Sequence, residues 1–207
     1  MKKFFSVLAV ALLIGGSAQA QNVQQEAVES LATAQQFVSA GNYSKAIEEI
    51  NYALAKINEL TAEELLNFIP EPPEGYTLVN KQAQGVGAAA AMVGSAGATA
   101  QYSNEAGATL DLNISIGGMT GKMAGLAALG SMFAALGQDA SGGQSRQIRV
   151  QGYTGTETFD AAGKTGNLAF QVGEQTSVTI EGTGINSAEV LTKLAGKIDM
   201  AGIEKNF

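Results

Sequence analysis

Apolar residues recur every three or four positions in the first part of the chain, which is the period of an amphipathic helix. In residues 23–38 the apolar face comprises Val23, Ala27, Leu31, Ala34 and Val38. After Gly41-Asn42 the pattern resumes, and its face comprises Ile47, Ile50, Leu54 and Ile57. Two amphipathic helices joined by a short turn form an αα-hairpin, so the sequence predicts a helical hairpin in residues 21–69.

A third, short helix is predicted at the end of this region. Thr61-x-x-Glu64 has the spacing of a capping box, which marks a helix start, and this helix is expected to end near Ile69. The only three prolines of the chain then fall within residues 70–75. Because proline fixes φ and restricts the residue before it, helix cannot continue. We expect a semi-rigid linker here, followed by a second unit at residues 76–207.

Beyond the prolines the apolar period changes to two. Residues 108–116, ATLDLNISI, alternate between apolar and polar side chains, which predicts a half-buried antiparallel strand. Similar stretches predict strands at 76–82, 98–103, 147–152, 154–160, 167–173 and 176–182. Ser187 is expected to cap a closing helix that carries Val190, Leu191, Leu194 and Ile198. The order predicts an α+β fold, in which the helical hairpin precedes an antiparallel sheet of six or seven strands with helices on one face.

Residues 119–137, MTGKMAGLAALGSMFAALG, predict a helix between the third and fourth strands that is apolar on all sides. Its bulky side chains form our candidate binding surface, which comprises Met123, Leu126, Leu129, Phe133 and Leu136. Three interpretations remain open: burial between the sheet and the hairpin, docking of a partner or an apolar ligand, and insertion into a membrane. The uncharged run 123–137 has 15 residues, fewer than the roughly 18 of a transmembrane segment, so insertion is the least favoured.

Two parts of the chain resemble known families. Residues 41–54, GNYSKAIEEINYAL, resemble the middle of a tetratricopeptide repeat, because Gly41, Tyr43, Ala46 and Ala53 occupy that family's turn, aromatic and small packing positions. One such unit cannot bury both of its faces, so we expect it to pack on the rest of the chain or on a partner. Residues 76–207 are similar in layout to exported PsbP-like α/β domains, a similarity that carries over no functional residue.

Residues 1–20, MKKFFSVLAVALLIGGSAQA, have the three parts of a secretory signal peptide. Two lysines precede an apolar region of 11 residues, 4–14, which is too short to span a bilayer that needs about 20. The small residues Ala18-Gln19-Ala20 then form a cleavage site. The chain has no cysteine to carry a lipid after cleavage. We therefore expect cleavage near Ala20 and a soluble mature protein that is periplasmic or secreted.

Charge and composition exclude several classes of function. Without the two lysines of the signal, 10 Lys and Arg stand against 19 Asp and Glu, a net charge of −9. Such a chain repels phosphate backbones and anionic headgroups, so no nucleic acid and no stable membrane insertion is expected. Histidine and cysteine are absent, which removes the commonest proton shuttle and the thiolate nucleophile. We expect no catalytic residue, no metal site and no cofactor.

Two glycine motifs invite a nucleotide-binding interpretation that their surroundings do not favour. Gly85-Val-Gly87-Ala-Ala-Ala90 matches G-x-G-x-x-A, but antiparallel strands rather than a βαβ unit are predicted after it. Gly163-Lys164-Thr165 resembles the end of a phosphate-binding loop, but Thr158 stands where that loop needs glycine. The sequence therefore favours a non-enzymatic envelope protein that binds another protein or an apolar ligand. The alternative is a membrane-associated protein that inserts residues 119–137.

Overall fold

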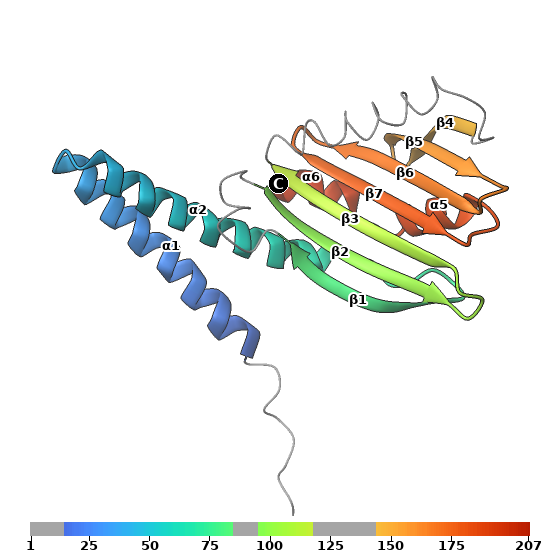
Figure 1. Ribbon diagram of the computed structural model, residues 1–207, viewed down its shortest axis with the longest axis horizontal. Coiled ribbons are helices and arrows are strands. Elements are labelled where there is room, and N and C mark those ends of the chain that lie inside the picture. The colour runs from blue at the N-terminus through green and yellow to red at the C-terminus, as the bar shows by residue number, and fades with distance from the viewer. Residues whose placement is uncertain (1–14, 85–94, 118–143) are drawn as a thin grey trace, which may run out of the picture.

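The computed structural model of the chain describes residues 15–84, 95–117 and 144–207 (Figure 1). Two long helices come first, α1 (Gly15–Ser39) and α2 (Tyr43–Leu65), and a short 3-10 helix, η1 (Leu66–Phe68), follows them. The strands are β1 (Tyr76–Gln84), β2 (Ser95–Asn104), β3 (Thr109–Gly117), β4 (Gln144–Val150), β5 (Tyr153–Asp160), β6 (Thr165–Val172) and β7 (Thr176–Thr183). Two short helices, α5 (Glu189–Ala195) and α6 (Met200–Asn206), come last.

All seven strands belong to one sheet in the order β1-β2-β3-β7-β6-β5-β4, and every neighbouring pair is antiparallel. Consecutive strands pair within β1–β3 and within β4–β7, and the two groups join where β3 lies beside β7. Helices α5 and α6 lie on one face of the sheet, while α1 and α2 extend away from it (Figure 1). The predicted α+β class is confirmed, with its helical pair, antiparallel sheet and helices on one face.

Each of the seven predicted strands is present, although several begin earlier than expected. β2 begins at Ser95, since its pairing with β3 continues to Gly117. β4 begins at Gln144, which pairs with Phe159. β6 begins at Thr165, because Lys164 takes a left-handed conformation with φ of 54° and closes the turn after β5. Apolar alternation therefore located the strands, while pairing decided where they begin.

The core lies between the sheet and the helices on its covered face. Alternate residues of β3, β6 and β7 supply its sheet side, which includes Leu110, Leu112, Ile114, Leu168, Phe170, Val178 and Ile180. The helices supply Leu191, Leu194 and Ile203. Gly182 lies where the segment leading into α5 packs on the sheet: a Cβ there would be 2.7 Å from Ile185 Cδ1 and 3.0 Å from Leu191 Cδ2. Glycine at this position therefore allows the helix to pack directly on the sheet.

The predicted third helix at 61–69 is wrong, because α2 continues without a break to Leu65. A capping box needs backbone N–H groups that lack intrahelical partners. The Thr61 hydroxyl instead donates to the carbonyl of Ile57, 2.9 Å away and one turn earlier. No proline or glycine interrupts residues 43–65, so the helix passes through the motif.

The single closing helix predicted after Ser187 is also wrong in its extent. The Ser187 hydroxyl accepts a hydrogen bond from the Glu189 amide at 3.1 Å, at the start of α5. That helix ends at Ala195, and Ile198 lies between it and α6. The carboxylate of Asp199 accepts from the Gly202 amide at 2.9 Å and caps the second helix. The segment therefore forms two short helices: Asp199 caps the second, whereas the N-cap residue of the first, Ala188, forms no side-chain cap hydrogen bond.

The proline-rich stretch is fixed to the sheet and its helices. The Tyr102 hydroxyl donates to the carbonyl of Pro70 at 2.8 Å, and the Lys197 ammonium donates to that of Pro72 at 2.6 Å. Pro73 is buried. Just before this stretch, Leu65 and Ile69 belong to the same apolar cluster as the sheet residues. The root of the hairpin is thus part of the core, and only its distal part extends into solvent (Figure 1).

Candidate functional site

The helical hairpin is held together by small residues. Ala27 and Ala34 of α1, together with Ala46 and Ala53 of α2, are almost completely buried where the two helices meet. Gly41 makes the turn with φ of 75°, a conformation that glycine adopts at no steric cost. Because alanine fills the contact, the larger apolar side chains of both helices are not needed to close it.

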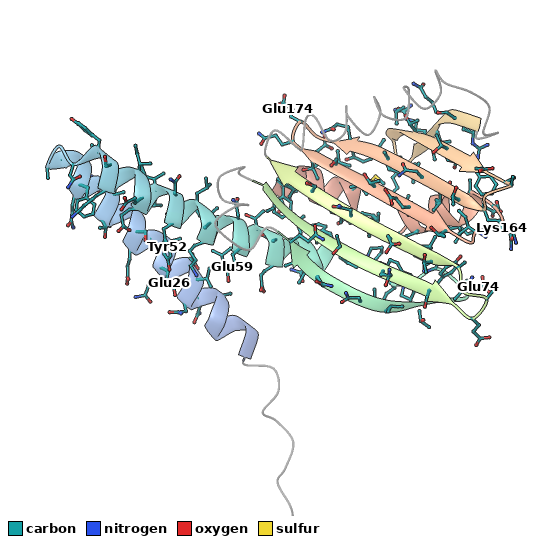
Figure 2. All side chains as sticks on the ribbon, in the orientation of Figure 1. Glu26, Tyr52, Glu59, Glu74, Lys164 and Glu174 are labelled. Atoms are coloured by element: carbon teal, nitrogen blue, oxygen red, sulfur yellow. The ribbon has the colours of Figure 1, made fainter. Side chains whose placement is uncertain are left out.

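One side of the hairpin carries a polar network between the two helices. The Lys56 ammonium lies 2.9 Å from the Glu26 carboxylate, which also accepts from the Tyr52 hydroxyl at 2.9 Å. Glu59 lies 3.5 Å from the same ammonium (Figure 2). The hydrogen bond from Lys56 lowers the pKa of Glu26, and the same contact raises the pKa of Lys56. These contacts join α1 to α2 and fix which side of each helix meets the other.

The side of the hairpin away from this network is apolar and exposed. The spacings of three, four and seven that relate its residues place them on one flank of each helix. We call this surface the uncharged face; it comprises Val28, Leu31, Val38, Tyr43, Ile47, Ile50, Leu54 and Ile57. Ile47 is 58% exposed and Leu31 is 46% exposed, values far above those of the alanines beside them. Contiguous exposed apolar surface of this kind is uncommon on monomeric soluble proteins, which makes the uncharged face a candidate binding surface.

Several charged residues of the hairpin point away from the uncharged face. Residues 15–65 contain seven glutamates and two lysines, a net charge of −5. Glu48 lies on the opposite side of α2 from Ile50, since the two are separated by about 200° around the helix. Lys56 and Glu26 face the network described above. The hairpin therefore presents an apolar strip with acidic surroundings.

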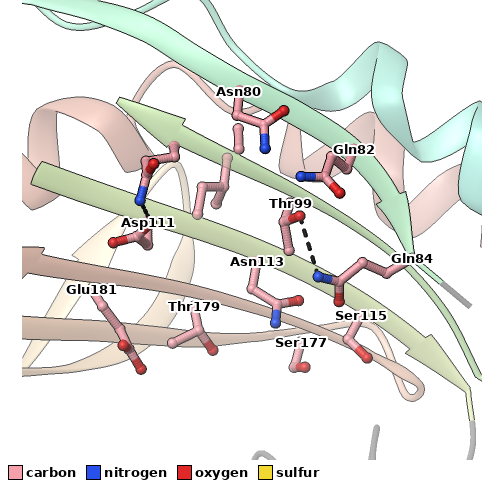
Figure 3. A pocket seen from close by; sticks show the side chains of 13 residues that line it. Asn80, Gln82, Gln84, Thr99, Asp111, Asn113, Ser115, Ser177, Thr179 and Glu181 are labelled. Carbon is pink, nitrogen blue, oxygen red and sulfur yellow. Dashed lines mark hydrogen bonds between the residues drawn. The ribbon is translucent and has the colours of Figure 1, made fainter. Parts of the chain in front are cut away.

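A second candidate surface lies on the face of the sheet opposite the helices. A hollow of about 700 Å³ opens over β1, β2, β3 and β7 (Figure 3). Its side chains are mostly amides and hydroxyls: Asn80, Gln82, Gln84, Thr99, Gln101, Asn113, Ser115, Ser177 and Thr179, with the carboxylates Asp111 and Glu181. The register aligns them in rows across the strands, for example Gln82, Thr99, Asn113 and Thr179.

Some of these polar groups are paired and others are not. Gln101 donates to the Asp111 carboxylate at 2.8 Å, and Gln84 donates to the Thr99 hydroxyl at 3.3 Å (Figure 3). Within the described part of the chain, the side-chain amides of Gln82 and Asn113 form no hydrogen bond. The hollow therefore holds oriented acceptors beside amides that can still bind a ligand.

The sequence motifs are placed as follows. The predicted surface at Met123, Leu126, Leu129, Phe133 and Leu136 lies outside the described residues, as do residues 85–90 and 1–14. Gly163 and Lys164 lie in the turn between β5 and β6, and Thr165 begins β6. Among residues 15–84, 95–117 and 144–207, no group of three or more Asp and Glu could hold a metal ion.

The comparisons with known proteins place this chain in no family. Compared with family models, with curated proteins and with solved structures, it matches none. The resemblances to tetratricopeptide and PsbP-like proteins therefore stay predictions. Any proposal about function therefore rests on the uncharged face and the hollow.

Sequence reasoning had named part of the uncharged face without assigning it a role. The apolar period places Ile47, Ile50, Leu54 and Ile57 on one face of the second helix, and it predicts that the hairpin packs on the rest of the chain or on a partner. In the structure the root of the hairpin packs on the sheet, whereas Ile47, Ile50 and Ile57 are exposed. The hollow was missed, because its side chains converge only through the pairing of four strands that are distant in sequence.

Proposed function

We propose that this chain is a non-enzymatic envelope protein, periplasmic or secreted, that binds another protein through the uncharged face of its hairpin. The observation that supports this most is the exposure of Ile47, Ile50 and Ile57 on one flank of α2, away from the pair of Glu26 and Lys56. A helix pair that needed only to fold would not retain such a strip in water, since exposed aliphatic area carries a free-energy cost.

The charge of the hairpin defines the partner's chemistry. With a net charge of −5, the hairpin attracts a cationic molecule and repels a second copy of itself. The complementary ligand is an amphipathic helix whose apolar side packs on Ile47 and Ile50 and whose flanks carry lysine or arginine. Such a helix would lie along the groove between α1 and α2, as amphipathic helices do on apolar grooves.

The size of the face fits a weak, transient complex. On α2 the face runs from Tyr43 to Ile57 and is therefore about 22 Å long. Two helices packed side by side give a width of about 20 Å and an area on the order of 450 Å². A stable interface of standard size buries about 800 Å² on each partner, and transient complexes bury less. One helix on this face therefore gives an interface of the transient class.

The structure offers less support for the other candidates. The hollow on the sheet is polar, so it does not suit an apolar ligand. Membrane association was proposed for residues 119–137, which lie outside the described residues. In the described part of the chain, no helix combines the length and apolar character needed to cross a membrane. Binding to a basic protein helix is therefore the function that the exposed isoleucines favour.

Fluorescence anisotropy with a labelled synthetic helix of leucine and lysine tests this proposal. We expect binding by the full mature chain that weakens at least about tenfold for each of Ile47→Ser and Ile50→Ser, because burying one isoleucine contributes about 1.5–3 kcal/mol. Val79→Ser, an equally exposed aliphatic residue on β1, is the matched control and should bind normally. Equal binding of a leucine and glutamate helix, or dimerisation of the chain in place of peptide binding, would contradict the proposal.

A further inference from the structure

The hollow over β1, β2, β3 and β7 is a second surface with its own chemistry, independent of the hairpin. We infer that it binds a neutral, hydroxyl-rich ligand, of which an oligosaccharide is the representative class. The amides of Gln82 and Asn113 and the carboxylates of Asp111 and Glu181 would hold it. This inference does not depend on the hairpin's partner, because no residue of the uncharged face lines the hollow.

The hydrogen-bonding groups of the hollow match hydroxyl groups. A sugar hydroxyl both donates and accepts one bond, and so it needs donors and acceptors side by side. A side-chain amide offers both, at a fixed separation, and a carboxylate accepts from two neighbouring hydroxyls. Gln82 and Asn113 lie on either side of Thr99 in one row of the sheet (Figure 3). Amide and hydroxyl side chains therefore alternate along this row. Successive hydroxyl groups of an extended ligand can form hydrogen bonds with them in turn.

Part of the hollow is already oriented for binding. The amide of Gln101 donates to Asp111 at 2.8 Å, which fixes that carboxylate, and Asp111 lies directly opposite Glu181 on the neighbouring strand. Two carboxylates in direct cross-strand pairing repel each other. Donors placed between them would relieve this repulsion. Sugar hydroxyls supply such donors without adding negative charge.

The lining also excludes other ligand classes. Among the described residues that line the hollow there is no lysine or arginine, and the two carboxylates repel anions, so phosphates and acidic sugars do not fit. The two lining residues with apolar side chains, Ala100 and Leu112, point into the core and are buried, which excludes lipids. No described group of acids is large enough to hold a metal ion. With anions, lipids and metal ions excluded, the lining favours a neutral polar ligand.

The dimensions suit an extended ligand. Four neighbouring strands span about 14 Å, since strands lie about 4.8 Å apart. The volume of about 700 Å³ lies inside the range of roughly 300–1,000 Å³ that small-ligand sites occupy. Aromatic rings, which stack on sugars in many sites, do not occur among the described lining residues. We therefore expect weak binding that rests on hydrogen bonds.

NMR titration of the 15N-labelled mature chain tests the inference, because the side-chain NH₂ groups of Gln82 and Asn113 report binding directly. The probes are a neutral oligomer of N-acetylglucosamine, a neutral oligomer of glucose, and polygalacturonate as the acidic counterpart. We expect both amide pairs to shift with at least one neutral oligomer and not with polygalacturonate. Asn113→Ala should weaken the affinity by about fivefold or more, the loss expected for one hydrogen bond.

Gln147→Ala is the matched control, because Gln147 lies on the same face and in the same row but outside the hollow, on β4. This variant should bind like the parent chain. The inference fails if neither neutral oligomer shifts these amides at millimolar concentration, if polygalacturonate shifts them equally, or if Asn113→Ala binds as well as Gln147→Ala. Because Ile47→Ser leaves the hollow intact, the same titration on that variant separates this inference from the proposed function of the hairpin.

Discussion

The Lys56 ammonium lies 2.9 Å from the Glu26 carboxylate, and this ion pair joins α1 to α2 on one side of the hairpin. The ion pair is formed in the same relative rotation of the helices that buries the alanines of both and leaves Ile47, Ile50 and Ile57 in solvent. The polar network and the uncharged face are therefore two consequences of one packing arrangement. A substitution in the polar network is therefore expected to alter the exposure of the uncharged face.

The pairing of Glu26 makes hairpin stability depend on pH. Contact with Lys56 lowers the pKa of Glu26 in the folded chain, so the pair stabilises the fold above about pH 4.5 and this contribution is lost as the pH falls through the lower folded pKa. We expect Glu26→Gln to lower the melting temperature at pH 7 and to have a smaller effect at pH 3, because part of the stabilisation is lost as the carboxylate is protonated. Thermal denaturation followed by circular dichroism measures both.

The control for that measurement is Glu29→Gln, an acid on the same helix whose recorded partner is the Gln25 amide rather than a lysine. Its effect should be small at both pH values. A destabilisation by Glu26→Gln that is as large at pH 3 as at pH 7 would show that the ion pair is not its cause.

The close approach of α5 to the sheet predicts a cost for any side chain at Gly182. Gly182→Ala would place a Cβ 2.7 Å from Ile185 Cδ1, and we expect a loss of about 1–3 kcal/mol in the free energy of unfolding, as overpacking of a core typically causes. Urea denaturation measures it. Gly196→Ala, whose Cβ would lie no closer than 3.4 Å to its neighbours, should change the stability little. Equal stability of the two variants would argue against this packing.

The buried hydroxyl of Tyr102 predicts an effect at alkaline pH. Burial raises the pKa of Tyr102, so the folded chain keeps its proton where the unfolded chain loses it, and stability falls as the pH rises above about 10. Tyr102→Phe removes the bond to the Pro70 carbonyl and should cost about 1 kcal/mol at pH 7. It should also lose less stability than the parent chain between pH 10 and 11. A constant difference over that range would contradict the assignment.

The sequence predicted elements better than it predicted surfaces. The alternation in residues 108–116 located β3, because one side of that strand is buried along its whole length. The capping-box spacing of Thr61 and Glu64 predicted a helix start that is not there, because a capping motif inside a continuous helix has no free N–H groups to bind. The exposure of Ile47 was not predictable from its helical period, because alanines rather than isoleucines close the hairpin. The hollow depends on strand pairing, for which local sequence carries little signal.

Methyl NMR of the isoleucines is the most direct test of the central claim, that the uncharged face binds a basic amphipathic helix. The mature chain, labelled at its isoleucine δ1 methyl groups, is titrated with the leucine and lysine helix. We predict that the signals of Ile47, Ile50 and Ile57 shift together and saturate, while those of the core residues Ile180 and Ile198 stay in place. Shifts confined to other isoleucines, or no shift at a saturating concentration of the peptide, would contradict the account.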